Sequence, residues 1–592
     1  MLSTAFGFLA AAGTCLAAPT LNSLRDTAAP VVSVKNGSYS GLYNSAYHQD
    51  RFLGIPYAQP PVGDLRFRVA ESLNSTWQDV RLAEAYTPFC VGYGGDNIGK
   101  EMSEDCLYLS VVRPSGVDAS AQLPVAAWIH GGGLFMGGSN DARYDPTFIV
   151  QNSVEMGTPM VAVSIQYRLS AWGFLGGKEV LDAGVTNLGF RDQRLALHWI
   201  QENIAAFGGS PSEVTIWGES AGGQSVGAQL LAYNGRDDKL FKGAIAQSGG
   251  PASIFFHNYY PGGYNSTAYD AIYGQLVRNT SCASSSAPLS CLRALPYAEL
   301  NGALNTSASR GFGPFSPMMD GDFIAEYPSK QLEAGRFVKV PLLIGANTDE
   351  GTAFNPGPVV RNDTAFLKAV EATHLPPQVA NIIAKLYPNL PRFGIPSFAT
   401  WPYNPDSAMA KSLGSQVRRM QAYFGDVVEH SPRRGANVAW AEHGVPSYSY
   451  RFDVTVNGVP NYIGATHFQE VAFVYNNTQG HGYATNPFGN LTAEETQRFG
   501  RLAREMSRGW VGFIVGGEPR SGVEGGVEWP VYEGRRWRWR GGRKGGEGWG
   551  GRAEGRNIVF SVNGTGSYVE RDSYRSEGMR FIRENLLAVY GV

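Results

Sequence analysis

A run of β-branched and aromatic residues ends abruptly in small ones at Val214-Thr-Ile-Trp-Gly-Glu-Ser-Ala-Gly-Gly223. Small and aliphatic residues then continue to Leu231. This pattern predicts a buried strand, a sharp turn with Ser220 at its apex, and a helix. The glycines suit such a turn because it brings the strand and helix backbones close together. The hydroxyl of Ser220 would then project above the sheet into a cleft.

The pentapeptide Gly218–Gly222 by itself leaves two interpretations open. With glycine at 74 of 592 positions, the pattern G-x-S-x-G is expected by chance roughly half a time in such a chain. Ser220 is therefore either a nucleophile at a strand-to-helix turn or a turn serine that caps the following helix.

Strands and helices alternate along the chain around this stretch. Apolar runs predict buried strands at 107–112, 124–130 and 160–166 before it, and one from Val340 after it. Residues 187–207 carry apolar side chains at helical spacing. The alternation predicts an α/β protein with a large, mostly parallel central sheet flanked by helices on both faces.

Three glycines follow the strand at 124–130, in His130-Gly-Gly-Gly133. A glycine run exposes backbone N–H groups that no side chain shields, and such groups can stabilise an oxyanion. The alternative is a flexible loop without a chemical role.

Length and composition describe an ordinary globular protein. Of the 592 residues, 43% are hydrophobic and 17% are charged, and the net charge is −2. This near balance gives no reason to expect nucleic acid or an anionic membrane as a partner. Large α/β folds run as one domain at this length, although several domains would also fit.

The first 18 residues have the features of a secretory signal peptide. Phe6 to Leu16 is apolar, and Leu16-Ala-Ala18 offers a cleavage site. The run is too short to span a bilayer and no other stretch qualifies, so we expect a secreted protein with no integral membrane segment. Of five cysteines, Cys15 would leave with the signal, and the other four can pair in an oxidising compartment. Nine glycosylation sequons agree with export, at Asn36, Asn74, Asn265, Asn279, Asn305, Asn362, Asn476, Asn490 and Asn563.

Several long motifs resemble those of one family. In chain order they are GIPYAQPPVGDLRF (54–67), EDCLYLSVVRP (104–114), HGGGLFMGG (130–138), YRLSAWGFL (167–175), NLGFRDQRLALHWIQENIAAFGGSP (187–211) and GESAGG (218–223). The chain is similar to type-B carboxylesterases, the α/β-hydrolase family that includes cholinesterases and fungal lipases. The resemblance implies an α/β-hydrolase fold, in a single domain over 19–592.

One basic, glycine-rich segment, at about 535–554, departs from the family pattern. It is either a polybasic loop that binds an acidic surface or polysaccharide, or a disordered insertion or unremoved intron. We favour the second interpretation because such a composition cannot bury a core.

An activated serine needs a base, and the base needs an acid that orients it. In this fold the chain order is Ser, then Asp or Glu, then His. Asp349 and Glu350 both follow the strand from Val340, and the family's D-E-G motif implies Glu350. Asp349 is expected to cap the following turn.

The resemblance also implies the base. Thr466-His-Phe-Gln-Glu470 is similar to the family's His followed by an acidic residue, which implies His467, whereas His481 is expected on the surface. Ser220 would attack an ester carbonyl while the N–H groups of Gly132, Gly133 and Ala221 hold the oxyanion. No metal or organic cofactor is required.

The cysteine spacing bears on the substrate. Cys282 and Cys291 most simply close a small loop, and a Cys90–Cys106 disulfide would staple a polar, glycine-rich loop to the sheet. Fungal lipases of the family have disulfides of similar span, and in them the first loop carries a long amphipathic lid. Residues 91–105 are too few and too polar for one, so we expect a carboxylesterase without a lid.

Two other functions remain as alternatives. One is a triacylglycerol or sterol-ester lipase, and the other is a catalytically silent, cholinesterase-like adhesion protein. Silent members typically lack a triad residue, whereas every position is filled here. Five phenylalanines could line an acyl pocket or pack in the core: Phe312, Phe315, Phe354, Phe468 and Phe473. The sequence names neither the ester nor an oligomeric state.

Overall fold

The computed structural model describes residues 29–253, 263–265, 268–306, 315–354, 359–390, 408–533, 555–564 and 566–592. The predicted signal peptide at 1–18, Phe312 and the basic segment at 535–554 lie outside these residues. None of the helices in these ranges is long and apolar enough to cross a membrane.

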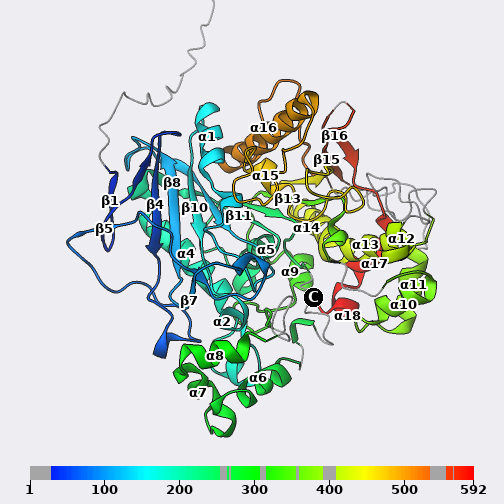
Figure 1. Ribbon diagram of the computed structural model, residues 1–592, viewed down its shortest axis with the longest axis horizontal. Helices are drawn as coiled ribbons and strands as arrows, with labels where there is room; N and C mark the ends of the chain where they lie inside the picture. Colours follow the sequence, from blue (N-terminus) through cyan, green and yellow to red (C-terminus); the bar gives the residue numbers. More distant parts are fainter. Residues whose placement is uncertain are drawn as a thin grey trace, which may run out of the picture.

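An eleven-stranded sheet runs through the centre of the molecule (Figure 1). In the central part of the sheet, from β15 to β10 in the order given below, each strand is parallel to its neighbours. At the edges, β16 is antiparallel to β15, and β8, β4 and β3 are each antiparallel to the strand before them in the sheet. The mostly parallel sheet predicted from the sequence is thus present. In sheet order the strands are β16 (Tyr568–Arg571), β15 (Arg556–Phe560), β14 (Ser447–Phe452), β13 (Leu342–Asn347), β12 (Gly243–Gln247), β11 (Gly209–Glu219), β9 (Leu123–Ile129), β10 (Val161–Ile165), β8 (Tyr108–Pro114), β4 (Gln49–Pro56) and β3 (Leu42–Asn44).

Helices cover both faces of this sheet, and a separate apolar core lies under each set. Side chains alternate along β9: Val125 and Ile129 belong to one core, whereas Ala126 and Trp128 belong to the other. The first core also takes side chains from α4 (Leu188–Asn203), α5 (Ala221–Gly235), α13 (Val417–Gly425) and α14 (Ser431–Glu442). The second takes them from α1 (Thr147–Glu155), α15 (Val471–Val474) and α16 (Ala493–Gly516). Burial on both faces explains why the central strands read as continuous apolar runs.

The remaining elements lie around these layers (Figure 1). One small sheet contains β1 (Val31–Val34), β2 (Gly37–Ser40) and β5 (Val80–Leu82). Another contains β6 (Phe89–Cys90) and β7 (Met102–Ser103). The other α-helices are α2 (Ser170–Phe174), α3 (Lys178–Asp182), α6 (Ala268–Arg278), α7 (Pro288–Ala294), α8 (Tyr297–Leu304), α9 (Pro328–Glu333), α10 (Asp363–Glu371), α11 (Pro377–Leu386), α12 (Ala408–Leu413), α17 (Ser576–Glu584) and α18 (Leu586–Tyr590). Disulfides join Cys90 to Cys106 and Cys282 to Cys291, the two pairs expected from the sequence.

The parallel strands bring distant residues to one edge. Ser220 follows β11, Glu350 follows β13, and His467 lies in the segment after β14. All three therefore come from the carboxyl ends of parallel strands, where open α/β sheets place their ligand sites.

Candidate active site

Ser220 occupies a strained turn between β11 and α5. Its backbone has φ 57° and ψ −126°, a conformation that a residue with a side chain adopts only when its surroundings enforce it. The N–H of Ser220 donates to the carbonyl oxygen of Gln247 at 2.8 Å. A Cβ on Gly222 would collide with the carbonyl oxygen of Ile129, and one on Gly218 with the backbone of Gly222. Glycine is thus required where the strand and helix backbones meet.

The hydroxyl of Ser220 does not cap α5; it hydrogen-bonds to His467 instead. The distance from Ser220 Oγ to His467 Nε2 is 2.7 Å, and that from His467 Nδ1 to Glu350 Oε2 is also 2.7 Å. Because a carboxylate accepts, Nδ1 carries the imidazole proton, and Nε2 is left to accept from the serine. The imidazole thus bridges the serine and the glutamate.

Glu350 is fully buried and held by three donors. Besides His467, the hydroxyl of Ser248 donates to Oε1 at 2.5 Å, and the N–H of Asn347 donates to the same oxygen at 2.7 Å. Hydrogen bonds of this kind favour the charged form of a carboxyl group. An ionised Glu350 would orient His467 and stabilise its cation.

Asp349 contacts a different segment from its neighbour. Its side chain does not cap the following 3-10 turn, η8 (Glu350–Thr352), so that expectation was wrong. Instead Oδ2 accepts the N–H of Ala465 at 3.0 Å, and the N–H of Asp349 donates to the carbonyl oxygen of Ala465 at 2.9 Å. Asp349 therefore fastens the segment carrying Glu350 to the one carrying His467. Burial raises the pKa of its carboxyl to about 6.

His481 lies on the surface, as expected. It is exposed, its Nε2 lies 3.1 Å from Gln479 Oε1, and its ring packs against Phe148 with 5.4 Å between centroids. The structure thus brings His467, and not His481, to Ser220.

The glycine loop, defined here as residues 130–138, lies against the Ser220 turn. A Cβ on Gly131 would lie only 3.0 Å from Ser220 Cβ. Gly132 and Gly133 have φ 93° and 63°, which glycine adopts without strain. Ala221 is the first residue of α5, so its N–H has no acceptor within the helix. The predicted oxyanion donors thus come from two segments that meet at Ser220.

His130, the first residue of the glycine loop, makes a hydrogen bond within the loop. Burial lowers the pKa of its imidazole to about 4, so the ring is neutral. Its Nδ1 lies 2.9 Å from the carbonyl oxygen of Gly131 and donates to it.

The sequence analysis missed a second buried carboxyl group beside His467. Glu219 Oε1 lies 3.3 Å from His467 Nε2. Burial, together with the nearby carboxyls of Glu470 and Glu350, raises the pKa of Glu219 well above its usual value. The signal was present, because Glu219 ends a strand predicted to be buried, and a carboxyl group there is unusual.

Glu470 anchors a further network behind the site. Its carboxyl oxygens accept from the amides of Gln247 at 3.0 Å and Asn347 at 2.7 Å. Burial raises the pKa of Glu470 as well. The last residues of β12 and β13 are thereby linked to the segment that follows His467.

The phenylalanines proposed for an acyl pocket separate into different roles. Phe354 packs on His467 with 4.6 Å between ring centroids. Phe473 is a core residue, fully buried against Phe488 at 4.6 Å. Phe315 is also buried, and Phe468 packs under the guanidinium of Arg143. Phe354 is thus the one that these contacts place beside the imidazole.

Known proteins resemble this chain over most of its length. The sequence model described as "Carboxylesterase family" matches residues 28–538. Lipase 2 of Geotrichum candidum is 34% identical over 472 residues, which cover 72% of this chain and 80% of that protein. A secreted triacylglycerol lipase of Gibberella zeae is 30% identical over 605 residues, covering 96% and 92%. The crystal structure of Aspergillus niger EstA superposes with a TM-score of 0.76 at 25% identity, over 96% of this chain and all of that one (100%).

Proposed function

The chain belongs to the carboxylesterase family, has an α/β-hydrolase fold and is a carboxylic ester hydrolase; from this premise we propose that Ser220, His467 and Glu350 are its catalytic triad. One observation carries the proposal: His467 hydrogen-bonds to Ser220 and to buried Glu350, at 2.7 Å each. Nucleophilic acyl transfer requires a serine, a base within hydrogen-bond reach of it, and an acid that orients the base.

In the proposed mechanism His467 Nε2 takes the proton of Ser220 as its oxygen attacks the ester carbonyl. The N–H groups of Gly132, Gly133 and Ala221 stabilise the tetrahedral oxyanion. His467 then protonates the leaving alcohol, and an acyl-enzyme remains on Ser220. Water activated by His467 repeats the sequence and releases the acid.

We propose further that the enzyme is an esterase without a mobile lid. The segment between Cys90 and Cys106, residues 91–105, is called the disulfide loop below. Its helical content is a 3-10 turn at Gly95–Asn97, and its side chains Tyr93 and Asn97 are buried. Such a loop has no amphipathic helix to cover an apolar mouth.

A lipase is the second candidate. It is favoured by the names of the relatives, which include lipases and a secreted triacylglycerol lipase. A lipase with this disulfide loop would need to cover its site with another segment. The two candidates differ in their preferred acyl chain and in their response to an oil–water interface.

Secretion and glycosylation also belong to this proposal. A secreted relative and the signal-like residues 1–18 support export. The sequon asparagines are exposed at Asn74, Asn265, Asn279, Asn305, Asn362, Asn490 and Asn563, and half-buried at Asn36 and Asn476. We treat residues 19–592 as one hydrolase domain that carries a basic insertion at about 535–554.

The test is the hydrolysis of p-nitrophenyl esters from acetate to palmitate by the secreted protein, with Ser220→Ala as the blank. We expect a maximum at short acyl chains, no jump in rate when the substrate forms a second phase, and no activity above background for Ser220→Ala at an unchanged melting temperature. A maximum at long chains with an interfacial jump would identify a lipase. Full activity in Ser220→Ala would refute the triad.

A further inference from the structure

The glycine loop needs support from outside itself. Five of its nine residues are glycine, and glycine backbones have more conformational freedom than any other. Yet two of its N–H groups are the proposed oxyanion donors, and such donors act only when they are held in position before the reaction.

The disulfide loop supplies contacts of this kind. The N–H of Tyr93 donates to the carbonyl oxygen of Phe135 at 2.8 Å, and Asn97 Oδ1 accepts the N–H of Gly137 at 2.9 Å. A Cβ on Gly92 would lie 2.8 Å from the carbonyl oxygen of Phe135. The two loops therefore touch backbone to backbone.

Asn97 contributes to this contact through its oxygen. Asn97 is 4% exposed, and its Nδ2 has no hydrogen-bond partner among the described residues. Burying an unpaired amide donor costs folding free energy. Within the described part of the chain, the one hydrogen bond of this side chain is therefore the one that its Oδ1 accepts from Gly137, which is also buried.

A shift at Gly137 would be passed to the proposed donors by short links. The next residue back, Met136, donates its N–H to the carbonyl oxygen of Gly132 at 3.0 Å, and Phe135 donates to the same oxygen at 3.1 Å. A Cβ on Gly132 would collide with the carbonyl of Met136. The turn from 132 to 136 is therefore tight and has little room to absorb a displacement.

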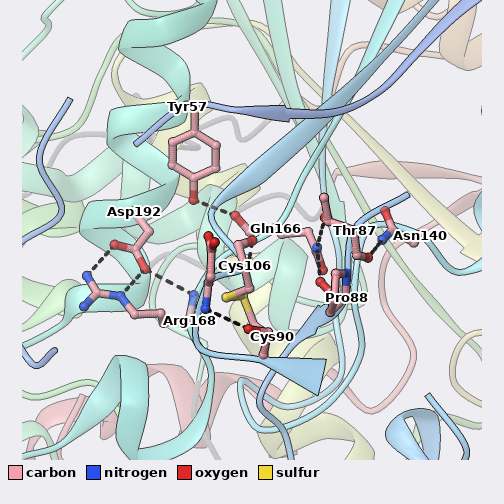
Figure 2. The surroundings of a disulfide bond; sticks show 11 residues. Tyr57, Thr87, Pro88, Cys90, Cys106, Asn140, Gln166, Arg168 and Asp192 are labelled. Atoms are coloured by element: carbon pink, nitrogen blue, oxygen red, sulfur yellow. Dashed lines mark hydrogen bonds and ion pairs between the residues drawn. A yellow bond between two sulfur atoms is a disulfide. The ribbon is translucent and has the colours of Figure 1, made fainter. Parts of the chain in front are cut away.

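The disulfide loop is itself anchored at its base, as Figure 2 shows. Gln166, just after β10, donates its side-chain amide to the carbonyl oxygen of Pro88 at 2.9 Å, and Asn140 donates to that of Thr87 at 2.7 Å. The Cys90–Cys106 disulfide closes the base. These bonds resist the swinging motion that a lid would need.

Its outer turn is also tied, towards the segment that carries the base. Asp96 pairs with Arg143 at 2.8 Å, and the guanidinium of Arg143 lies 4.7 Å from the ring centroid of Phe468, the residue after His467. The disulfide loop thus contacts the glycine loop directly and, through Arg143, the segment that carries His467.

We propose that Asn97 is a positioning residue for the oxyanion hole, which holds the glycine loop through Gly137 so that the N–H groups of Gly132 and Gly133 face Ser220. The inference rests on the proposed triad and its oxyanion donors. It assigns the disulfide loop the role of a fixed support and not that of a moving lid.

The test compares Asn97→Leu with Asn97→Asp on a short-chain p-nitrophenyl ester. Leucine has a similar size but no acceptor, so kcat should fall about tenfold with KM within about twofold, because an oxyanion donor acts mainly in the transition state. Aspartate keeps the oxygen, and its kcat should stay within about threefold of wild type. A trifluoromethyl ketone, which forms an oxyanion on the serine, should bind Asn97→Leu about tenfold more weakly.

The outcomes separate the two claims. If Asn97→Leu keeps the wild-type kcat while Ser220→Ala is inactive, the positioning role is refuted and the triad stands. An equal loss in Asn97→Leu and Asn97→Asp would also refute it, because the shared oxygen would then be irrelevant. Activity in Ser220→Ala would remove both. Should Asn97→Leu fail to fold, Asn97→Ala removes the acceptor without adding bulk and answers the same question.

Discussion

The two sides of His467 each carry a buried glutamate, and the two differ in their hydrogen bonds. Glu350 lies 2.7 Å from Nδ1 and Glu219 lies 3.3 Å from Nε2, with side chains 0% and 1% exposed. Three donors converge on Glu350. Glu219 Oε1 has no hydrogen-bond partner among the described residues. The two carboxyl groups are thus equally buried but differ in the number of hydrogen-bond donors that they receive.

This difference favours the imidazole proton on Nδ1 over Nε2. An ionised group at Nδ1 holds the proton there and stabilises the cation that forms when the serine is deprotonated. An ionised group at Nε2 would instead compete with Ser220 for that nitrogen. The raised pKa of Glu219 favours the neutral form of its carboxyl, which leaves Nε2 available to Ser220.

The largest expected effect is on the Nδ1 side. Glu350→Gln keeps the shape but removes the charge that orients His467, so kcat should fall by about 10³- to 10⁴-fold. Steady-state kinetics on a short-chain ester checks this, with Asp349→Asn as the control one residue away. A loss below tenfold would mean that Glu350 is not the acid of the triad.

Removing one donor should weaken the same side by less. Ser248→Ala deletes the 2.5 Å hydrogen bond to Glu350 Oε1 and leaves the Asn347 bond in place. A hydrogen bond to a charged group is worth roughly 1.5–3 kcal/mol, so we expect kcat to fall about tenfold. The acid limb of the pH–rate profile should shift too; an unchanged rate and profile would show that Ser248 does not support Glu350.

The Nε2 side should tolerate neutralisation. Glu219→Gln replaces a carboxyl group whose raised pKa favours its neutral form with a neutral amide of the same size, so kcat/KM should stay within about threefold of wild type. A hundredfold loss would contradict the comparison, because it would show that Glu219 acts as a charged group.

The substitution Asp349→Asn should have the smallest effect on the rate and a measurable effect on the stability of the fold. Asp349→Asn keeps an acceptor for Ala465, so kcat should stay within about twofold. The folded-state pKa of about 6 lies above the unfolded value, so the folded protein binds more protons between pH 4 and 6. The Asp349 carboxyl group therefore stabilises the folded protein more as pH falls below 6, and this contribution disappears as pH rises above 6.

Asparagine does not titrate, which makes the comparison measurable. From pH 7 to pH 4, wild type should gain about 2–3 kcal/mol of unfolding free energy relative to Asp349→Asn. Denaturant unfolding at both pH values checks this. A difference that stays constant or changes in the other direction would show that the folded-state pKa of Asp349 is not raised above its unfolded value.

Local sequence patterns predicted those parts of the site that depend on backbone geometry. Ser220 could be located because a strand, a glycine-lined turn and a helix are all local features. Choosing Glu350 over Asp349 needed the family resemblance, since both follow the same strand. The resemblance also indicated His467, and the loop residues around His481 predicted that His481 is exposed. The structure places His467 against Ser220, and Glu350 against the other side of the imidazole.

What the sequence did not predict depends on contacts between distant segments. Asn97 looked like one polar residue in a glycine-rich loop, and its bond to Gly137 joins positions 40 residues apart. Glu219 stood in the quoted motif, but its raised pKa depends on its burial and on Glu470 and Glu350, more than a hundred residues away. Asp349 was expected to cap a turn, whereas the acceptor is used by Ala465, from another segment.

The central claim is that Ser220 is the nucleophile that His467 activates. The most direct measurement is to inactivate the enzyme with a fluorophosphonate and map the adduct by peptide mass spectrometry. We predict one adduct, on the peptide that contains Ser220, formed in step with the loss of activity and much more slowly in Glu350→Gln. Complete inactivation with Ser220 unmodified, or an adduct on another residue, would contradict the account.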